Sequence, residues 1–151
     1  MLDRETYSYR NDEAIPAFDD AYDVVVMDAA CALCSGAARV IARLDRRDRF
    51  RICPVQSPLG RALLVHYGLA ADDPESWLFL SEGRAYESMD GIARAAGRLG
   101  GVAAPLGLLG LVPVRWQDSL YRWVARNRYR LFGGGDLCAM PDPRVRSRLI
   151  A

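Results

Sequence analysis

The sequence predicts a single α/β domain with the element order β-α-β-α-β-β-α and one additional C-terminal helix. The chain has 151 residues, of which 51% are hydrophobic and 26% charged, as expected of one packed globular domain. Short β-branched runs alternate with segments whose apolar residues recur at helical spacing. The alternation is broken once, where a tight Glu82-Gly83 turn predicts a hairpin.

The first strand and helix flank a pair of cysteines. Residues 22–27 form a Val-rich run that indicates a buried strand. Ala37, Val40, Ile41 and Leu44 recur at i, i+3, i+4 and i+7, which predicts one apolar helix face. The intervening Cys-x-x-Cys therefore lies where a buried strand leads into a helix N-terminus.

The second strand and helix are marked by their ends. Residues 49–55 alternate as in a strand. Ser57 can cap the helix that follows, Pro58 suits its first turn and Gly68 suits its end.

A hairpin and a third helix complete the predicted core. Residues 77–80 and 84–87 predict two antiparallel strands around the tight turn, and a helix follows over residues 89–99. We interpret the order as two parallel βαβ steps followed by a hairpin and a helix. This is the thioredoxin arrangement, so the predicted fold class is thioredoxin-like α/β.

The C-terminal part adds a long helix. Residues 100–110 predict a packed loop or short helix, and residues 113–132 a long helix ended by three glycines. Its expected buried stripe consists of Trp116, Leu120, Trp123, Val124 and Leu131. The apolar segment 102–114 fits a core element, a partner groove or a membrane-surface contact.

The acidic N-terminus predicts a separate arm. We expect residues 1–20 to be flexible and residues 21–151 to form a single thioredoxin-like domain with a C-terminal helical extension. The net charge is −6 over residues 1–30 and +5 over residues 113–151, within a total of +1. A total so close to zero makes nucleic acid an improbable partner.

Composition excludes several kinds of site and points to a compartment. The chain has no lysine, which excludes a Schiff-base enzyme, and a single histidine, His66, which excludes a histidine-rich metal site. We expect no export signal, because the N-terminus has acidic residues where a signal peptide has a basic stretch and an apolar run. We expect no transmembrane segment, because the longest uncharged stretch, residues 99–114, is shorter than the roughly 20 residues needed to span a bilayer. The expected compartment is the cytoplasm, where unpaired cysteines stay reduced.

Cys31 and Cys34 form the strongest candidate site. Residues three apart in the first turn of a helix share one face, so the two thiols can form a disulfide with little backbone motion. The free N–H groups and positive dipole of the helix N-terminus stabilise a thiolate. We expect Cys31, nearer the exposed lip, to be the nucleophile and Cys34 to resolve the mixed disulfide.

Asp28 lies three residues before Cys31 and has two compatible roles. A partly buried carboxylate there could accept or return the proton of Cys34. It could also cap the helix or bind the loop.

The alternative to a redox pair is a metal site. Cys31, Cys34, Cys53 and Cys138 together could hold zinc, but zinc ribbons use two close pairs and this chain has one. We interpret Cys53 as a buried, inert side chain. Cys138 is either an accessory redox thiol or a packed residue.

The chain resembles the DCC family of predicted thiol–disulfide oxidoreductases, named for an Asp-x-x-Cys-x-x-Cys signature. That signature is present at residues 28–34, and further matches include residues 54–56, 124–133 and 136–138. The resemblance covers about residues 22–150 and implies a thioredoxin-like fold with a redox role for both cysteines. One departure is Ala29, where the family commonly has glycine. Pro74 is the one candidate for the cis-proline that thioredoxins place beside the pair.

Arginines and tyrosines of the long helix form a basic, aromatic face. They are Tyr121, Arg122, Arg126, Arg128, Tyr129 and Arg130. We interpret this face as solvated, with a docking surface as the alternative. We also expect His66 to be a surface residue near a helix end.

Together these features predict a thiol–disulfide oxidoreductase that needs no bound cofactor. Its partners would be a protein or small-molecule disulfide and a second dithiol system that donates electrons. The alternative is a redox-inert or zinc-binding thioredoxin-like module that docks partners.

Overall fold

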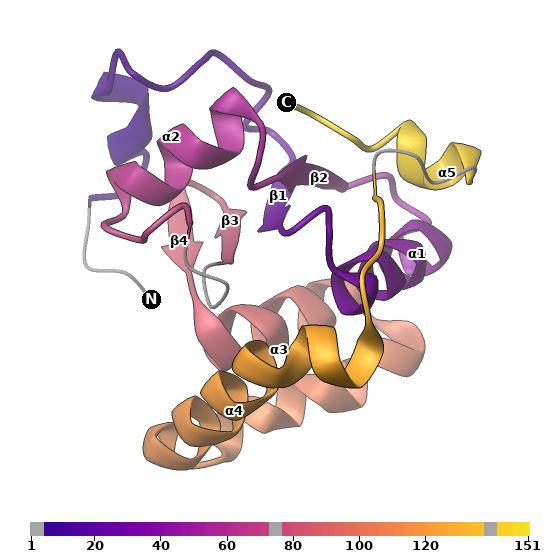
Figure 1. Ribbon diagram of the computed structural model, residues 1–151. Coiled ribbons are helices and arrows are strands. Elements are labelled where there is room, and N and C mark those ends of the chain that lie inside the picture. Colours follow the sequence, from indigo (N-terminus) through magenta and orange to yellow (C-terminus); the bar gives the residue numbers. More distant parts are fainter. Residues whose placement is uncertain (1–4, 73–76, 138–141) are drawn as a thin grey trace.

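A four-stranded mixed sheet forms the centre of the protein (Figure 1). We analysed a computed structural model that describes residues 5–72, 77–137 and 142–151. The strands are β1 (Asp23–Met27), β2 (Phe50–Pro54), β3 (Leu78–Ser81) and β4 (Arg84–Tyr86), in the spatial order β2-β1-β3-β4. Expected and observed strands agree to within two residues at each end.

The direction of β3 corrects one detail of the expected topology. β1 pairs with β2 in parallel but with β3 in antiparallel register, with Val25 opposite both Ile52 and Phe79. The expected second parallel step is therefore wrong, because an apolar run of four residues carries no signal of strand direction. The parallel β1–β2 pair and the antiparallel β3–β4 hairpin still place the fold in the thioredoxin-like α/β class.

Helices cover both faces of the sheet (Figure 1). They are the 3₁₀ helices η1 (Ser8–Asn11) and η2 (Gly101–Leu111), and the α-helices α1 (Ala32–Leu44), α2 (Pro58–His66), α3 (Ser88–Leu99), α4 (Val114–Phe132) and α5 (Pro143–Arg146). One apolar layer joins the sheet to α1, α3 and α5, and the other joins it to α2 and the N-terminal segment.

The described part of the N-terminal segment, residues 5–20, packs against α2. The sequence predicts a flexible arm over residues 1–20, but Tyr9 is buried with α2 and Phe18 lies against it. His66, at the end of α2, is buried instead of exposed, since it bonds Ser8 through Nε2 (2.9 Å) and Asp12 through Nδ1 (2.7 Å). These contacts, 54 or more residues apart in sequence, hold the segment against α2.

The side of helix α1 that faces the core differs from the side that its apolar spacing predicts. The buried residues are Ser35, Ala38, Ile41 and Ala42, whereas Val40 is half exposed. Three of the four buried side chains are small, and Ile41 is the one buried residue that the apolar spacing predicts.

Helix α2 is positioned by its predicted cap and by a close approach to β2. Ser57 Oγ accepts a hydrogen bond from the Gly60 N–H at 3.0 Å. A Cβ on Gly60 would lie 2.1 Å from the backbone oxygen of Pro54, which leaves no room for a side chain.

Gly60→Ala is therefore expected to destabilise the fold by at least about 1–3 kcal/mol, because the helix must shift away from the strand. Urea unfolding measures this loss. Gly97→Ala, on α3 with nothing within 4 Å of the added Cβ, is the matched control and should leave the protein as stable or more so. Equal stability of the two variants would contradict the close approach.

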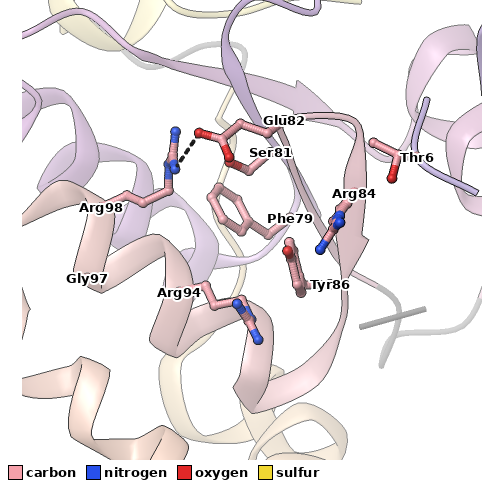
Figure 2. Close-up of a pocket in the computed structure, with 9 residues that line it drawn as sticks. All are labelled: Thr6, Phe79, Ser81, Glu82, Arg84, Tyr86, Arg94, Gly97 and Arg98. Atoms are coloured by element: carbon pink, nitrogen blue, oxygen red, sulfur yellow. Dashed lines mark hydrogen bonds and ion pairs between the residues drawn. The ribbon is translucent and has the colours of Figure 1, made fainter. Parts of the chain in front are cut away.

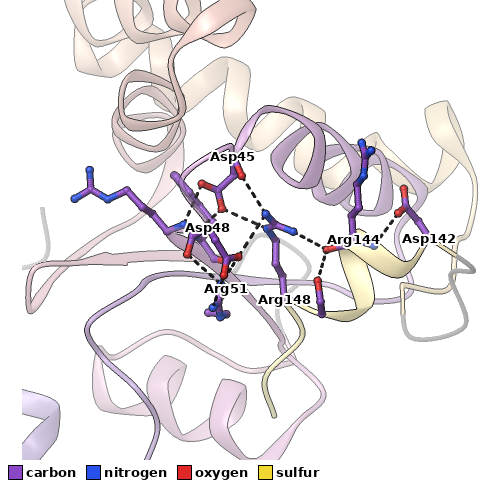
Figure 3. Close-up of polar contacts among 9 residues, drawn as sticks. Asp45, Asp48, Arg51, Asp142, Arg144 and Arg148 are labelled. Atoms are coloured by element: carbon purple, nitrogen blue, oxygen red, sulfur yellow. Dashed lines mark hydrogen bonds and ion pairs between the residues drawn. The ribbon is translucent and has the colours of Figure 1, made fainter.

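Helix α5 and the C-terminal residues cover the β2 edge of the sheet. The Ile52 N–H donates to the Arg148 carbonyl, and the Ile150 N–H to the Ile52 carbonyl, at 2.8 and 2.9 Å. The buried Arg148 guanidinium binds the Asp45 carboxylate and backbone oxygen, at 3.3 and 3.0 Å (Figure 3). Asp45 in turn accepts the Phe50 N–H, which ties the end of α1 to β2.

Helix α4 has the predicted bounds but not the predicted burial. Trp116, Leu120, Trp123 and Leu131, expected in the core, are each more than half exposed. The buried residues of α4 are instead Gln117, Ala125 and Arg128. The apolar stripe was misassigned because Arg128, on another side of the helix, is buried against Asp28, 100 residues away in sequence.

Within the described residues, no helix is both long and apolar enough to cross a membrane.

Candidate functional site

The two cysteines of the Cys-x-x-Cys motif lie at the junction that the sequence predicts. Cys31 is the N-cap of α1, with an extended backbone, and Cys34 lies in the first turn of the helix. Both are free thiols. Because both cysteines lie at the N-terminus of α1, they are close to the positive end of the dipole of this helix.

A glycine segment covers Cys31. We call residues 133–135 the glycine strap. Cys31 forms a β-bridge with Gly134, the Ala32 N–H donates to the Gly133 carbonyl at 3.3 Å, and the Gly135 N–H donates to the Ala30 carbonyl at 2.9 Å. Cys31 is consequently 0% exposed, and Cys34 is the partly exposed thiol.

This burial corrects the expectation that Cys31 lies nearer the exposed lip. The expectation considered only the strand-to-helix turn. The strap follows α4, a hundred residues later in the chain, and reverses the relative exposure of the two thiols.

Asp28 is buried and accepts four hydrogen bonds. Its Oδ1 accepts from Gln56 Nε2 at 2.7 Å and from the Ala30 N–H at 2.9 Å. Its Oδ2 accepts from Arg128 Nη2 at 2.6 Å and from the Tyr129 hydroxyl. The Ala30 bond is the predicted loop contact of this aspartate.

The four donors keep Asp28 ionised. Burial alone would raise the pKa of Asp28, but the hydrogen bonds from Tyr129, Gln56 and Ala30, with the charge of Arg128, outweigh burial and hold the pKa below its usual value. A carboxylate with a lowered pKa is a weak base, so this environment favours a positioning role over proton transfer.

Arg128 is a buried cation beside the thiols, not part of a solvated face. The guanidinium is desolvated, which lowers its pKa, but its contact with Tyr129 and the neighbouring Cys34, Cys31 and Asp28 more than compensate and raise the pKa overall. The positive charge in turn partly offsets the rise in the pKa of Cys34. Arg128 can therefore stabilise negative charge on a sulfur at this site.

Cys34 is held in its protonated form. Burial, together with the charge of Cys31 and a hydrogen bond with it, raises the pKa of Cys34 to about 12. A thiol that keeps its proton near neutral pH is a poor first nucleophile.

Replacing Cys31 by serine is expected to lower the pKa of Cys34, because both contributions from Cys31 raise it. Burial remains, so the value should stay above the ordinary thiol value. The pH dependence of iodoacetamide alkylation, followed at Cys34 by mass spectrometry, measures the change. Cys53→Ala serves as control, and an equal pKa in wild type and Cys31→Ser would contradict the thiol–thiol contact.

The four-cysteine zinc site is not assembled as proposed. Cys53 belongs to the apolar layer on the α2 side, where its thiol contacts Ser57 Oγ at 3.4 Å. Cys34 packs in the opposite layer. No cluster of three or more metal-ligating side chains occurs in the described ranges. Cys138 and Pro74 lie outside them.

A pocket of about 580 Å³ lies at the other end of the sheet (Figure 2). It opens between β3–β4 and α3. Arg98 at its edge binds Asp23 at 2.8 Å and Glu82 at 3.1 Å, and Arg94 stacks over Tyr86. Asp23 begins β1 and the cysteines follow its end, so this pocket is separate from the thiols.

The sequence around the two cysteines has counterparts among known proteins. The model of the DCC1-like thiol-disulfide oxidoreductases matches residues 25–134, which include both cysteines, Asp28 and Arg128. The chain belongs to the DCC1-like thiol-disulfide oxidoreductase family.

Two relatives of this DCC1-like chain support the assignment. The protein YuxK of Bacillus subtilis is 30% identical over 127 residues, which cover 84% of this chain and 93% of YuxK. A chloroplastic DCC family protein of Arabidopsis thaliana is 29% identical over 123 residues, 81% of this chain and 72% of the relative. No solved structure matches the chain.

Sequence reasoning missed three residues of this DCC1-like site. Gln56, Arg128 and Tyr129 all bind Asp28. Each lies in a stretch that resembles the DCC family, and this was the available signal. Their roles were obscured because a polar residue in a loop or helix does not reveal a partner 28 or 100 residues away.

Proposed function

We propose that the protein exchanges disulfides through Cys31 and Cys34. The observation that carries this proposal is the buried Arg128 guanidinium, fixed by Asp28, beside two free thiols in the first turn of a helix. Both the cation and the helix N-terminus favour a thiolate.

The proposed reaction begins with the Cys31 thiolate. It attacks one sulfur of a substrate disulfide, which breaks, and the leaving thiolate takes up a proton. Cys34 then attacks Cys31 Sγ and its proton passes to the departing second sulfur of the substrate, which leaves as a thiol while the Cys31–Cys34 disulfide forms. Two electrons pass to the substrate, a protein or small-molecule disulfide, and a second dithiol system returns them to the pair.

The high pKa of Cys34 supports this order of attack. Cys34 keeps its proton in the resting protein and is suited to act second. The burial of Cys31 requires the glycine strap to open when a substrate arrives. Asp28 would act as a positioning residue that holds Arg128.

A redox titration tests the proposed chemistry. The protein is equilibrated with mixtures of reduced and oxidised dithiothreitol, its thiols are alkylated, and disulfides are located by mass spectrometry. We expect one reversible Cys31–Cys34 disulfide with a defined potential, unchanged in Cys53→Ala. Failure to form this disulfide at any ratio would overturn the proposal and favour a redox-inert docking module.

Trapping of mixed disulfides tests the order of attack. Cys34→Ser should accumulate mixed disulfides with a model substrate such as a small aromatic disulfide, because the resolving thiol is absent. Cys31→Ser should accumulate few. The reverse pattern would make the more exposed Cys34 the attacking thiol.

A further inference from the structure

Helices η2 and α4 carry an apolar surface that nothing in the described structure covers. Its side chains are between 49% and 83% exposed. They are Val102, Leu106, Leu108, Leu111, Val114, Trp116, Leu120 and Trp123, which we call the η2–α4 surface. Both helices lie against α3, on one side of the sheet (Figure 1). An exposed set of this size marks an interaction site more often than a chance arrangement.

The apolar stripe of α4 is separate from the side that packs. Trp116, Leu120 and Trp123 recur at i, i+4 and i+7 and share one side of the helix. The buried Gln117 lies one residue, or about 100°, further around from Trp116. The tryptophans therefore point away from the contacts that hold α4 in place.

Positive charge borders this stripe. Arg115, Arg122, Arg126 and Arg130 are exposed on α4 and lie next to the stripe on the side opposite Gln117. Asp118 is the one acidic residue of the helix. No charged residue occurs between Leu99 and Val114, so the adjoining η2 is wholly uncharged.

This combination fits an anionic bilayer better than a second copy of the chain. A symmetric pairing through the surface would bring the arginines of two α4 helices together, and like charges repel. Tryptophan prefers the headgroup level of a bilayer, leucine the acyl boundary, and arginine the anionic headgroups.

We propose that the η2–α4 surface docks the protein onto membranes rich in anionic phospholipid. Binding is peripheral. Trp116 and Trp123 enter the interface while the arginines contact lipid phosphates. This inference rests on α4 and η2 alone and holds whether or not the cysteines are redox-active.

Vesicle flotation with the intact protein tests the proposal. The probes are vesicles of phosphatidylcholine with about 30–40% of the anionic lipid phosphatidylglycerol, and vesicles of phosphatidylcholine alone. We expect binding to the anionic vesicles that weakens as salt rises, with a blue shift of tryptophan emission. Binding to neither, or equally to both, would overturn the proposal.

Paired variants locate the contact. Trp116→Ser with Trp123→Ser should lower the partition coefficient at least tenfold, whereas Val65→Ser, an exposed apolar residue on α2, should not. Arg122→Gln with Arg130→Gln should lower it about 25-fold on anionic vesicles, at about fivefold per arginine, and Arg61→Gln on α2 should not.

Sedimentation of the same variants tests the alternative that a second copy of the chain covers the η2–α4 surface. We expect wild type and the tryptophan variant to sediment as the same species. A wild-type dimer that the tryptophan substitutions dissociate, without vesicle binding, would overturn the proposal in favour of a self-interface. Thermal melts of all variants establish that exposed substitutions leave the fold intact.

Discussion

Replacing Asp28 by asparagine is expected to lower the free energy of unfolding by about 3–5 kcal/mol at neutral pH. The two partners of the ion pair, Asp28 and Arg128, are each only 6% exposed. Asparagine keeps the shape of the side chain but leaves the guanidinium buried without its counter-charge. The loss should appear as a lower urea midpoint with an unchanged m-value.

The pH dependence of this loss has a defined sign. The pKa of Asp28 is lower in the folded protein than in the unfolded chain, where an aspartate has a pKa of about 3.9. Its stabilising contribution is therefore complete above about pH 4 to 5 and is lost as the pH falls through the folded pKa. The difference between wild type and Asp28→Asn should shrink over that acidic range.

Two further variants distinguish the loss of the buried Asp28–Arg128 ion pair from the effect of removing any carboxylate. Asp90→Asn removes the exposed partner of Arg94 and should cost only about 0.3–0.5 kcal/mol. Adding Arg128→Met to Asp28→Asn should recover part of the lost stability, because no isolated cation remains buried. If Arg128→Met destabilises the Asp28→Asn variant as much as it destabilises wild type, the two side chains are not energetically coupled.

The sequence predicts those parts of the fold that depend on neighbours along the chain. The Val-rich β1, the Ser57 cap of α2 and the hairpin at Glu82-Gly83 were all predicted, and each is specified within about five residues. Both turn residues have positive φ, as a type I′ hairpin turn requires. The position of Cys31 and Cys34 at the start of α1 follows from the same local signals.

Features that depend on distant partners were not predictable in this way. A helical wheel of α4 assigns Trp116 to the core and Arg128 to solvent, and the structure reverses both. The burial of Arg128 follows from its ion pair with Asp28, which fixes the side of α4 that packs against the site. Periodicity ranks residues by hydrophobicity alone. It therefore contains no information on an ion pair such as Arg128–Asp28, whose partners are 100 residues apart in sequence.

The glycine strap shows the same limit at the reactive site. Three consecutive glycines after a helix predict only its end, and Gly133 does end α4 with a positive φ. That the next two residues lie along Cys31 and Ala30 depends on where α4 ends relative to β1. The accessibility of Cys31 is thus determined at the tertiary level.

Gly135→Ala is expected to expose Cys31. A Cβ at this position would lie 2.9 Å from Ala32 Cα and from Ser35 Oγ, so the strap must move away from the start of α1. Overpacking of this kind costs about 1–3 kcal/mol. If strap opening precedes reaction at Cys31, this loss of free energy falls on the closed state alone. The ratio of open to closed protein then rises about 5- to 150-fold.

The rate of alkylation at Cys31, read by mass spectrometry under native conditions, measures this change. Gly134→Ala is the matched control, because its Cβ would make only an ordinary contact with the Ala30 oxygen at 3.8 Å. The rate at Cys34, which is already partly exposed, should change far less in either variant. Parallel increases at Cys31, Cys34 and the buried Cys53 would indicate general unfolding instead.

A selective increase at Cys31 connects the geometry to the order of attack. In the closed state Cys31, the thiol suited to attack first, is covered, while the partly exposed Cys34 holds its proton. Opening of the strap is then the step that admits a disulfide, and Gly135→Ala should also speed mixed-disulfide formation in Cys34→Ser by a similar factor. If Cys31 alkylation rises but mixed-disulfide formation does not, substrate enters by Cys34 and the attack order is the reverse of the one proposed.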